Sequence, residues 1–138
     1  LDVTVELLNG MAFQGTTPGE HRVGFDAASV NGGQDMGFRL MELMLVALAG
    51  CTAIDVISIL RKKRQQVTNY TVNVHGKRAD EHPRVFTGIT VHHEVSGVDV
   101  QAEAVKRASE LYDTRYCPAI AMLDKTAHIT NTYNIRRA

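Results

Sequence analysis

The chain has two cysteines, and their surroundings in the sequence differ. Cys51 lies within an apolar run, residues 43–54, that contains no charged side chain. Cys117 directly precedes Pro118, a residue favoured at the first position of a helix, so its sulfur is predicted to cap a helix N-terminus. Because free N–H groups and the positive end of a helix dipole stabilise a thiolate there, Cys117 is a candidate reactive thiol.

The surroundings of Cys51 favour the opposite behaviour. A thiol among aliphatic side chains ionises less readily, and Asp55, one helical turn later, raises its pKa further. Only a nearby cation reverses this effect, and the candidates are Arg22, Arg39 and the basic residues 61–64 of a second copy of the chain. The competing interpretation is that Cys51 is an inert, small core residue.

The elements that position these thiols follow from the periodicity of apolar residues. Alternation of apolar and polar residues indicates strands, and the long proline-free segment after residue 40 is apolar on most faces, which indicates a buried helix. The strands are grouped rather than alternating with helices, which favours an α+β fold with antiparallel sheets packed around a long central helix. The predicted elements are strands at 3–7, 11–15, 22–26, 70–76, 86–95 and 128–135, and helices at 40–66, 100–112 and after Cys117.

Length and charge narrow the classes of partner. With 138 residues and 15.2 kDa, the chain is predicted to form a single domain over residues 1–138. Fifteen basic residues balance fifteen acidic ones, so no net charge attracts nucleic acid or an anionic membrane. The basic run at 61–64 is interpreted as the solvated end of the long helix, where cations complement the helix dipole.

Three features predict a cytoplasmic protein without a membrane span. The uncharged stretch at 43–54 is shorter than the roughly 18 to 20 residues that cross a bilayer. No basic segment followed by an apolar one is visible at the N-terminus. Two cysteines are too few for a disulfide-stabilised secreted scaffold, which favours a reducing compartment.

The long helix also predicts the oligomeric state. A helix that is apolar on nearly every face needs more cover than one small sheet provides. A second copy of the chain is the simplest source of that cover, so we expect an intertwined homodimer.

Two stretches around the cysteines resemble the OsmC/Ohr family of hydroperoxide peroxidases. In that family a helix with a Glu-Leu-Leu-x-x-Ala-x-x-Gly-Cys type motif carries one cysteine, and a Tyr-Cys-Pro type motif carries the other. Here the matching stretches are residues 42–56, which contain Cys51, and Tyr116-Cys117-Pro118. The predicted order of elements is similar to that family as well, so the resemblance covers nearly the whole chain.

The resemblance implies a thiol-dependent reduction of organic hydroperoxides in oxidative or osmotic stress defence. Cys51 would attack the peroxide and become a sulfenic acid, and Cys117 would capture it as an intramolecular disulfide. An external thiol or dithiol would then reduce the disulfide by exchange. The resemblance implies an enzyme without a cofactor whose catalytic residues are Cys51 and Cys117.

The match departs from the peroxidases at the position of the activating carboxylate. Those enzymes have a carboxylate ten residues before the first cysteine, beside an arginine, whereas this chain has Met41 there and Glu42 one residue later. Leu40 replaces the usual preceding proline, and no arginine can be matched by motif. The chain therefore looks more like the OsmC-like branch of the family.

Two other interpretations compete with a peroxidase. Six histidines and two cysteines suggest a metal site, but no paired ligand spacing exists, and His92 and His93 point to opposite faces of one predicted strand. We therefore expect no metal. The stronger alternative is a non-catalytic OsmC-like dimer that binds a small apolar ligand or thiol.

Overall fold

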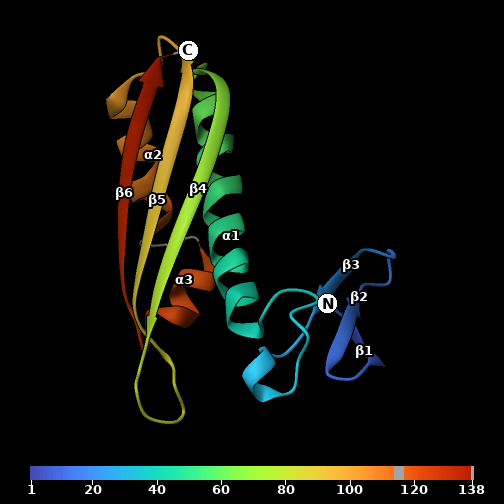
Figure 1. Ribbon diagram of the computed structural model, residues 1–138. Helices are drawn as coiled ribbons and strands as arrows, with labels where there is room; N and C mark the ends of the chain where they lie inside the picture. The colour runs from blue at the N-terminus through green and yellow to red at the C-terminus, as the bar shows by residue number, and fades with distance from the viewer. Residues whose placement is uncertain (114–116, 138) are drawn as a thin grey trace. The chain divides into compact units, whose positions relative to one another are not determined.

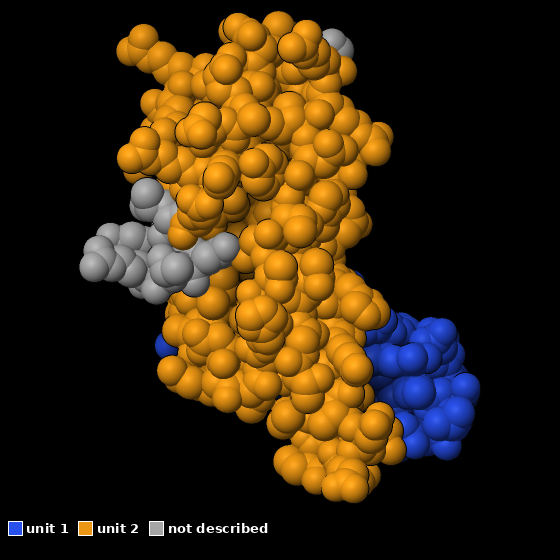
Figure 2. Space-filling model, turned by 90° about the vertical axis from the view of Figure 1, so that its left-hand side faces the viewer, with its two compact units in different colours: residues 1–44 blue, residues 45–138 orange. Residues whose placement is uncertain are grey.

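The computed structural model describes residues 1–113 and 117–137, without the side chains of residues 111–113. It contains two compact units, a first unit of residues 1–44 and a second unit of residues 45–138 (Figure 2). The elements follow the predicted order of three strands, a long helix, two strands, two helices and a strand (Figure 1). The predicted α+β class is confirmed, whereas the single domain over residues 1–138 stays a prediction.

The first unit contains a three-stranded antiparallel sheet in the order β1–β2–β3. Gly10 makes the β1–β2 turn with a φ of 53°, a left-handed conformation that glycine adopts without strain. The rings of Phe13 and Phe25 stack across β2 and β3 with their centroids 5.7 Å apart. The predicted N-terminal meander is therefore confirmed. Its strands are β1 (Thr4–Asn9), β2 (Ala12–Thr16) and β3 (Arg22–Phe25).

A buried carboxylate organises the connection between β3 and the long helix. Asp26 is only 5% exposed, and its carboxylate accepts N–H groups from Ala27 at 2.7 Å, Gln34 at 3.0 Å and Met36 at 3.2 Å. These donors, that of Gln34 first, hold the pKa of Asp26 below its usual value. The connection includes the short 3-10 helix η1 (Ser29–Asn31). Its backbone is thus held in place by hydrogen bonds to the Asp26 side chain.

The central helix α1 (Leu40–Lys62) begins where the sequence predicts and ends earlier. At its start, the Glu42 carboxylate accepts the backbone N–H of Arg39 at 2.8 Å, which satisfies one free donor of the first turn. At its end, Arg64 takes a left-handed conformation with a φ of 56°, so the helix stops at Lys62 instead of continuing to residue 66. Glu42 is therefore a capping residue.

One stripe of α1 is buried, and much of its remaining surface is not. Leu48, Thr52, Val56 and Leu60 recur every four residues and are buried. By length and composition α1 could cross a membrane. Its most apolar window of 18 residues has a mean hydropathy of 2.3, and 22% of that window is buried. Core helices of water-soluble proteins have the same composition, and the buried stripe here packs on a β-sheet.

That sheet belongs to the second unit and has the strand order β4–β5–β6. The pair β4–β5 is an antiparallel hairpin, as predicted, with Tyr70 opposite Val95. The pair β5–β6 is parallel, with Ile89 opposite Ile129, which corrects the expectation of purely antiparallel sheets. Two helices connect β5 to β6, and such a crossover returns the chain in the same direction. The elements are β4 (Gln66–Arg78), β5 (Phe86–Val98), α2 (Ala102–Asp113), α3 (Pro118–Leu123) and β6 (His128–Arg137).

The core of the second unit lies between this sheet and the helices. Helix α1 runs along β4, and α2 lies by β5 and β6 (Figure 1). Val56 and Leu60 of α1 meet Val95 of β5 and Val105 of α2, and all four are fully buried. From Ile89 to Gly97, every second residue of β5 is buried, as an alternating strand with one covered face requires.

One of these inward residues is a histidine. His93 is 0% exposed, and its Nδ1 lies 2.7 Å from the hydroxyl oxygen of Tyr70. Its Nε2 lies 3.0 Å from the Oδ1 of Asn131. A neutral ring satisfies both contacts if Tyr70 donates to Nδ1 and Nε2–H donates to Asn131. Burial, the first cause, lowers the pKa of His93, which favours this neutral state.

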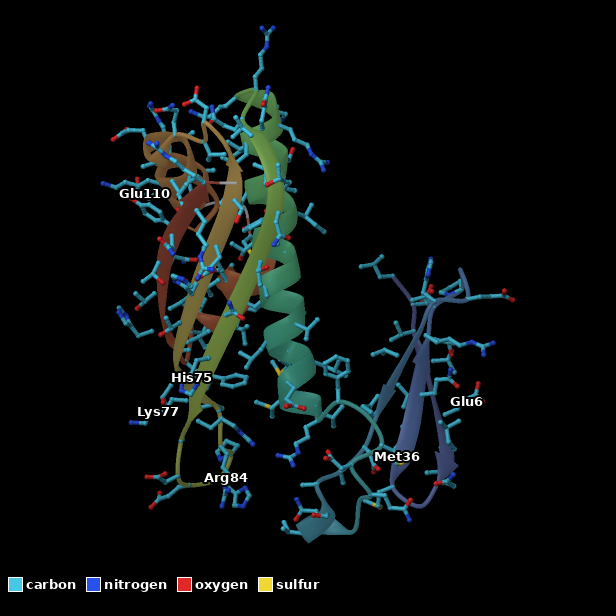
Figure 3. The ribbon with its side chains drawn as sticks, turned by 45° about the horizontal axis from the view of Figure 1, so that its top comes forward. Glu6, Met36, His75, Lys77, Arg84 and Glu110 are labelled. Carbon is cyan, nitrogen blue, oxygen red and sulfur yellow. The ribbon has the colours of Figure 1, made fainter. Side chains whose placement is uncertain are left out.

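The opposite face of the same sheet is polar. His75 and Lys77 project from β4 (Figure 3), and both are exposed. On β5 and β6 the ring of His92 lies 2.6 Å from the Thr132 hydroxyl. His92 and His93 thus point to opposite faces, as the strand pattern predicts.

Candidate functional site

Cys117 lies at the N-cap of α3, where the sequence predicts it. The side chain is 4% exposed, and its sulfur accepts the backbone N–H of Ile120 at 3.4 Å. Pro118 occupies the first helical turn, where its missing N–H costs nothing. The predicted N-cap position of Cys117 is confirmed.

The two sulfurs are in contact. Cys51 projects from α1 and is partly exposed, and its Sγ lies 2.9 Å from the Sγ of Cys117, although the two residues are 66 positions apart in the sequence. A disulfide has a sulfur–sulfur bond of about 2.05 Å, so these are two free thiols in contact. The fold therefore brings together both residues that the sequence selects.

The environment of Cys51 disfavours its ionisation. Burial raises the pKa of Cys51 to about 11, and the neighbouring Cys117 and, more weakly, Asp55 act in the same direction. The backbone N–H of Ala119 opposes them, because it donates to the Cys51 sulfur and lowers the pKa. With a pKa near 11, roughly one Cys51 in ten thousand is a thiolate at pH 7.

The first turn of α3 therefore serves both sulfurs. The N–H of Ala119 is directed to Cys51, and the N–H of Ile120 is directed to Cys117. Sequence analysis found the cap at Cys117 but missed the second donor. The signal was available in the Cys-Pro pair, because a proline at the first position leaves the next two N–H groups as the first free donors.

Among the described residues of the second unit, no cation offsets the burial of Cys51. Within its described part, none of the groups that shift the pKa of Cys51 is positively charged. The basic residues 61–64 follow Cys51 by ten residues or more, which places them about 15 Å further along the helix axis. Of the other candidates, Arg22 lies in β3 and Arg39 precedes α1, both in the first unit.

The positions that correspond to the activating residues of the peroxidases have other roles here. Leu40 and Met41 form the start of α1, and Glu42 caps that helix through the Arg39 N–H. Tyr116 of the Tyr-Cys-Pro motif lies outside the described residues. Among the described residues, Asp55 is the only carboxylate that shifts the pKa of Cys51, and it raises that pKa.

Metal ligands do not gather in the part of the chain that the structure describes. No group of three or more histidine, cysteine or acidic side chains is positioned to hold an ion among these residues. Both ring nitrogens of His93 already face Tyr70 and Asn131, a contact set that sequence reasoning missed because it joins three separated strand positions. The absence of a cofactor stays a prediction.

A pocket of about 560 Å³ opens beside α3 within the second unit. Its floor includes the buried residues Ser109, Ile120 and Ala127, and its rim includes the exposed Glu110 of α2, which points away from the core (Figure 3). Ile120 lines this pocket with its side chain and holds Cys117 through its N–H. The remaining lining residues are Lys106, Asp124, His128, Ile129, Asn131 and Tyr133.

These features define a class of protein, namely an α+β protein in which a long helix presents one cysteine to a second cysteine at the start of a short helix. The family model for OsmC-like proteins matches residues 32–132, which is more than half of the chain. The chain belongs to the OsmC-like family.

Individual relatives agree with this assignment. The protein YhfA of Escherichia coli K12 is 38% identical over 135 residues, which cover 98% of this chain and 98% of that protein. The crystal structure of an OsmC-like protein from Mycoplasma pneumoniae matches with a TM-score of 0.81 at 19% identity, over 97% of this chain and 95% of that one. An organic hydroperoxide resistance protein OsmC from Legionella pneumophila matches with a TM-score of 0.67 at 13% identity, over 97% of each chain. At these identities the two structures show a shared fold.

Proposed function

We propose that the protein is a thiol-dependent peroxidase that reduces organic hydroperoxides in the cytoplasm, as part of oxidative or osmotic stress defence. The observation that carries this proposal is the 2.9 Å contact between the Cys51 and Cys117 sulfurs. A sulfenic acid formed on one sulfur has its capturing thiol in contact, so no large rearrangement is needed before the disulfide forms.

The reaction has two chemical steps and a reset. The Cys51 thiolate attacks the outer peroxide oxygen, the O–O bond breaks, and the leaving alkoxide takes a proton to become an alcohol. The Cys117 thiol then attacks the Cys51 sulfenic acid, which forms the disulfide and releases water. A thiol or dithiol reductant restores both thiols by exchange and leaves as its own disulfide.

Exposure favours Cys51 as the attacking residue. It is partly exposed, whereas Cys117 is 4% exposed, so a peroxide reaches Cys51 first. The apolar, largely buried surroundings of the two sulfurs contain little water, which favours an organic peroxide over hydrogen peroxide. The raised pKa of Cys51 is the obstacle, and a cation other than the described groups of the second unit is required to overcome it.

A homodimer supplies both cover and charge in this proposal. Leu40, Met44, Val46 and Ile54 on α1 are between 43% and 68% exposed, an apolar surface that a second copy would bury. The second copy also brings its own arginines to the first copy. Light scattering at micromolar concentration should therefore give twice the chain mass of 15.2 kDa, and a single 15.2 kDa species would contradict the dimer.

Titration of the reduced protein with cumene hydroperoxide tests the chemistry. We expect one equivalent of peroxide to be consumed per chain and two thiols to be lost. Cys117→Ser should accumulate a sulfenic acid that dimedone traps, and Cys51→Ser should consume no peroxide. Equal consumption by Cys51→Ser and the native protein would remove Cys51 from the mechanism.

A second candidate function is binding of a small ligand without turnover. The pocket beside α3 favours it, because its volume of about 560 Å³ lies within the usual range for small-molecule sites. In that case the protein keeps both thiols after exposure to peroxide. The titration above separates the two functions in one measurement.

A further inference from the structure

The thiol pair offers two sulfur ligands at one place in the fold. Cys51 and Cys117 lie in contact, and no third histidine, cysteine or acidic side chain joins them among the described residues. Thiolates select soft ions and elements over hard ones. A species that suits this pair must therefore be thiophilic and must need two protein ligands, whereas a structural zinc ion needs four.

The distance between the sulfurs narrows the class further. With bonds of about 2.3 Å, as in a zinc thiolate, two sulfurs lie about 4.6 Å apart across a linear centre and about 3.8 Å apart across a tetrahedral one. A pyramidal centre with an angle near 90° brings them to about 3.3 Å by the same arithmetic. The observed separation is 2.9 Å, so the pyramidal centre requires the smallest movement of Cys51 and Cys117.

Trivalent arsenic that carries one organic group meets these conditions. It has two remaining valences, it is pyramidal because of its lone pair, and it binds thiols strongly. We propose that the Cys51–Cys117 pair is a binding site for monosubstituted trivalent arsenicals, an inference that rests on the proposed function only in using the same two thiols.

The binding step is a condensation and needs no oxidant. An arsenical of the form R–As=O loses its oxygen, each sulfur forms one bond to arsenic, and the two thiol protons leave with the oxygen as one water. Arsenic stays trivalent and each sulfur keeps its oxidation state. The partly exposed Cys51 forms the first bond, and the buried Cys117, already in contact, closes the ring.

Phenylarsine oxide added to the reduced protein tests this site. Intact-mass analysis should show one phenylarsenic group per chain, with loss of one water, and thiol titration should show that two thiols disappear per arsenic. Cys51→Ser and Cys117→Ser should each bind the reagent about 10²- to 10⁴-fold more weakly, because the second bond is then lost. Loss of one thiol per arsenic in the native protein, or equal affinity in the serine variants, would overturn the inference.

The native protein unfolded in urea is the matched control, and it does not depend on whether the variants fold. The same two thiols are then separated by a flexible loop of 66 residues, which lowers their effective concentration for each other. We expect weaker binding in urea than in buffer. Equal binding in both would show that the folded geometry contributes nothing and would overturn the inference.

The outcome is separable from that of the proposed function. Arsenical binding through both thiols without peroxide consumption would support the site and refute the peroxidase. Peroxide consumption with only one thiol lost per arsenic would support the peroxidase and refute the arsenical site. Both assays use the same preparation of reduced protein.

Discussion

The two units of the chain differ in how much apolar surface they bury. The second unit has a cluster of buried residues from α1, α2 and β5, in which Val56, Leu60 and Val95 are fully buried. In the first unit, all of whose residues are described, only Ala12 and Asp26 are buried. The second unit thus builds a core from its own elements, whereas the first unit has a sheet without one.

Strand β1 shows what the first unit lacks. Val5, Leu7 and Leu8 are 54%, 59% and 57% exposed, although each is a residue type that is usually buried. Full burial of one such side chain is worth about 1.5 to 3 kcal/mol. A strand with this composition is expected to be covered in solution, and the proposed second copy of the chain would cover it.

The largest expected effect is a core truncation in the second unit. Leu60→Ala removes a fully buried side chain from the cluster and should lower the free energy of unfolding by about 2 to 5 kcal/mol. Leu7→Ala in β1 is the matched truncation in the first unit. In the proposed dimer, which covers β1, this variant should also lower the free energy of unfolding, but by less than Leu60→Ala; in an isolated chain with β1 exposed, the change should be no more than about 0.5 kcal/mol.

Urea denaturation of both variants checks the comparison. A cost for Leu7→Ala that approaches that of Leu60→Ala would show that β1 is buried in solution. In a dimer that cost should also depend on protein concentration, because dissociation exposes β1. Concentration-independent, equal costs would contradict both the difference between the units and the proposed dimer.

Local patterns predicted much of the fold. Alternation gave the strands, and the Cys-Pro pair gave the cap at α3. The parallel pairing of β5 with β6 was not predictable in the same way, because it depends on the crossover through α2 and α3 and not on the pattern within either strand. The contact between Cys51 and Cys117 was implied by a family resemblance, since the two residues are 66 positions apart in the sequence and no local signal links them.

The next largest effect concerns the pH dependence of Cys51. If the second unit acts alone on this thiol, the rate of peroxide consumption should rise about tenfold per pH unit, or about 100-fold between pH 7 and pH 9. The reason is that the thiolate fraction increases in this way below a pKa of about 11. Stopped-flow measurement with cumene hydroperoxide gives the profile.

A flat profile over this range would identify a cation beside Cys51. Because no described group of the second unit supplies one, the cation would come from outside those residues, and Arg22 and Arg39 are the candidates in the first unit. Arg22→Gln and Arg39→Gln should then each be tested for restoring the steep profile. Restoration of the steep profile by either variant would show that an arginine of the first unit lowers the pKa of Cys51.

A smaller effect is expected from the buried histidine of the second unit. The pKa of His93 is lowered from 6.5, so the unfolded chain binds a proton on this side chain at a higher pH than the folded protein does. The stability is therefore complete above about pH 6.5 and falls as the pH decreases below it, by at most about 1.4 kcal/mol per pH unit. Denaturation of the native protein and of His93→Gln between pH 5 and pH 8 should show this dependence in the native protein alone.

His92→Gln is the control for that measurement. His92 precedes His93 but lies on the exposed face of the same sheet, where it contacts Thr132. We expect this variant to keep most of the pH dependence, because burial is the first cause of the lowered pKa of His93 and the charge of His92 is a smaller one. Loss of the dependence in His92→Gln would mean that the exposed face, and not the buried network with Tyr70 and Asn131, carries the effect.

The smallest effect is expected at Glu42, where the capping role and the role of the carboxylate in the peroxidases make different predictions. As a cap, Glu42 accepts the Arg39 N–H, so Glu42→Ala should cost about 1 kcal/mol or less of stability, and Glu42→Gln should cost less because its amide oxygen can still accept. Neither variant should alter the pH profile of peroxide consumption. A shift of that profile in Glu42→Gln, at unchanged stability, would show that this carboxylate acts on the thiol pair.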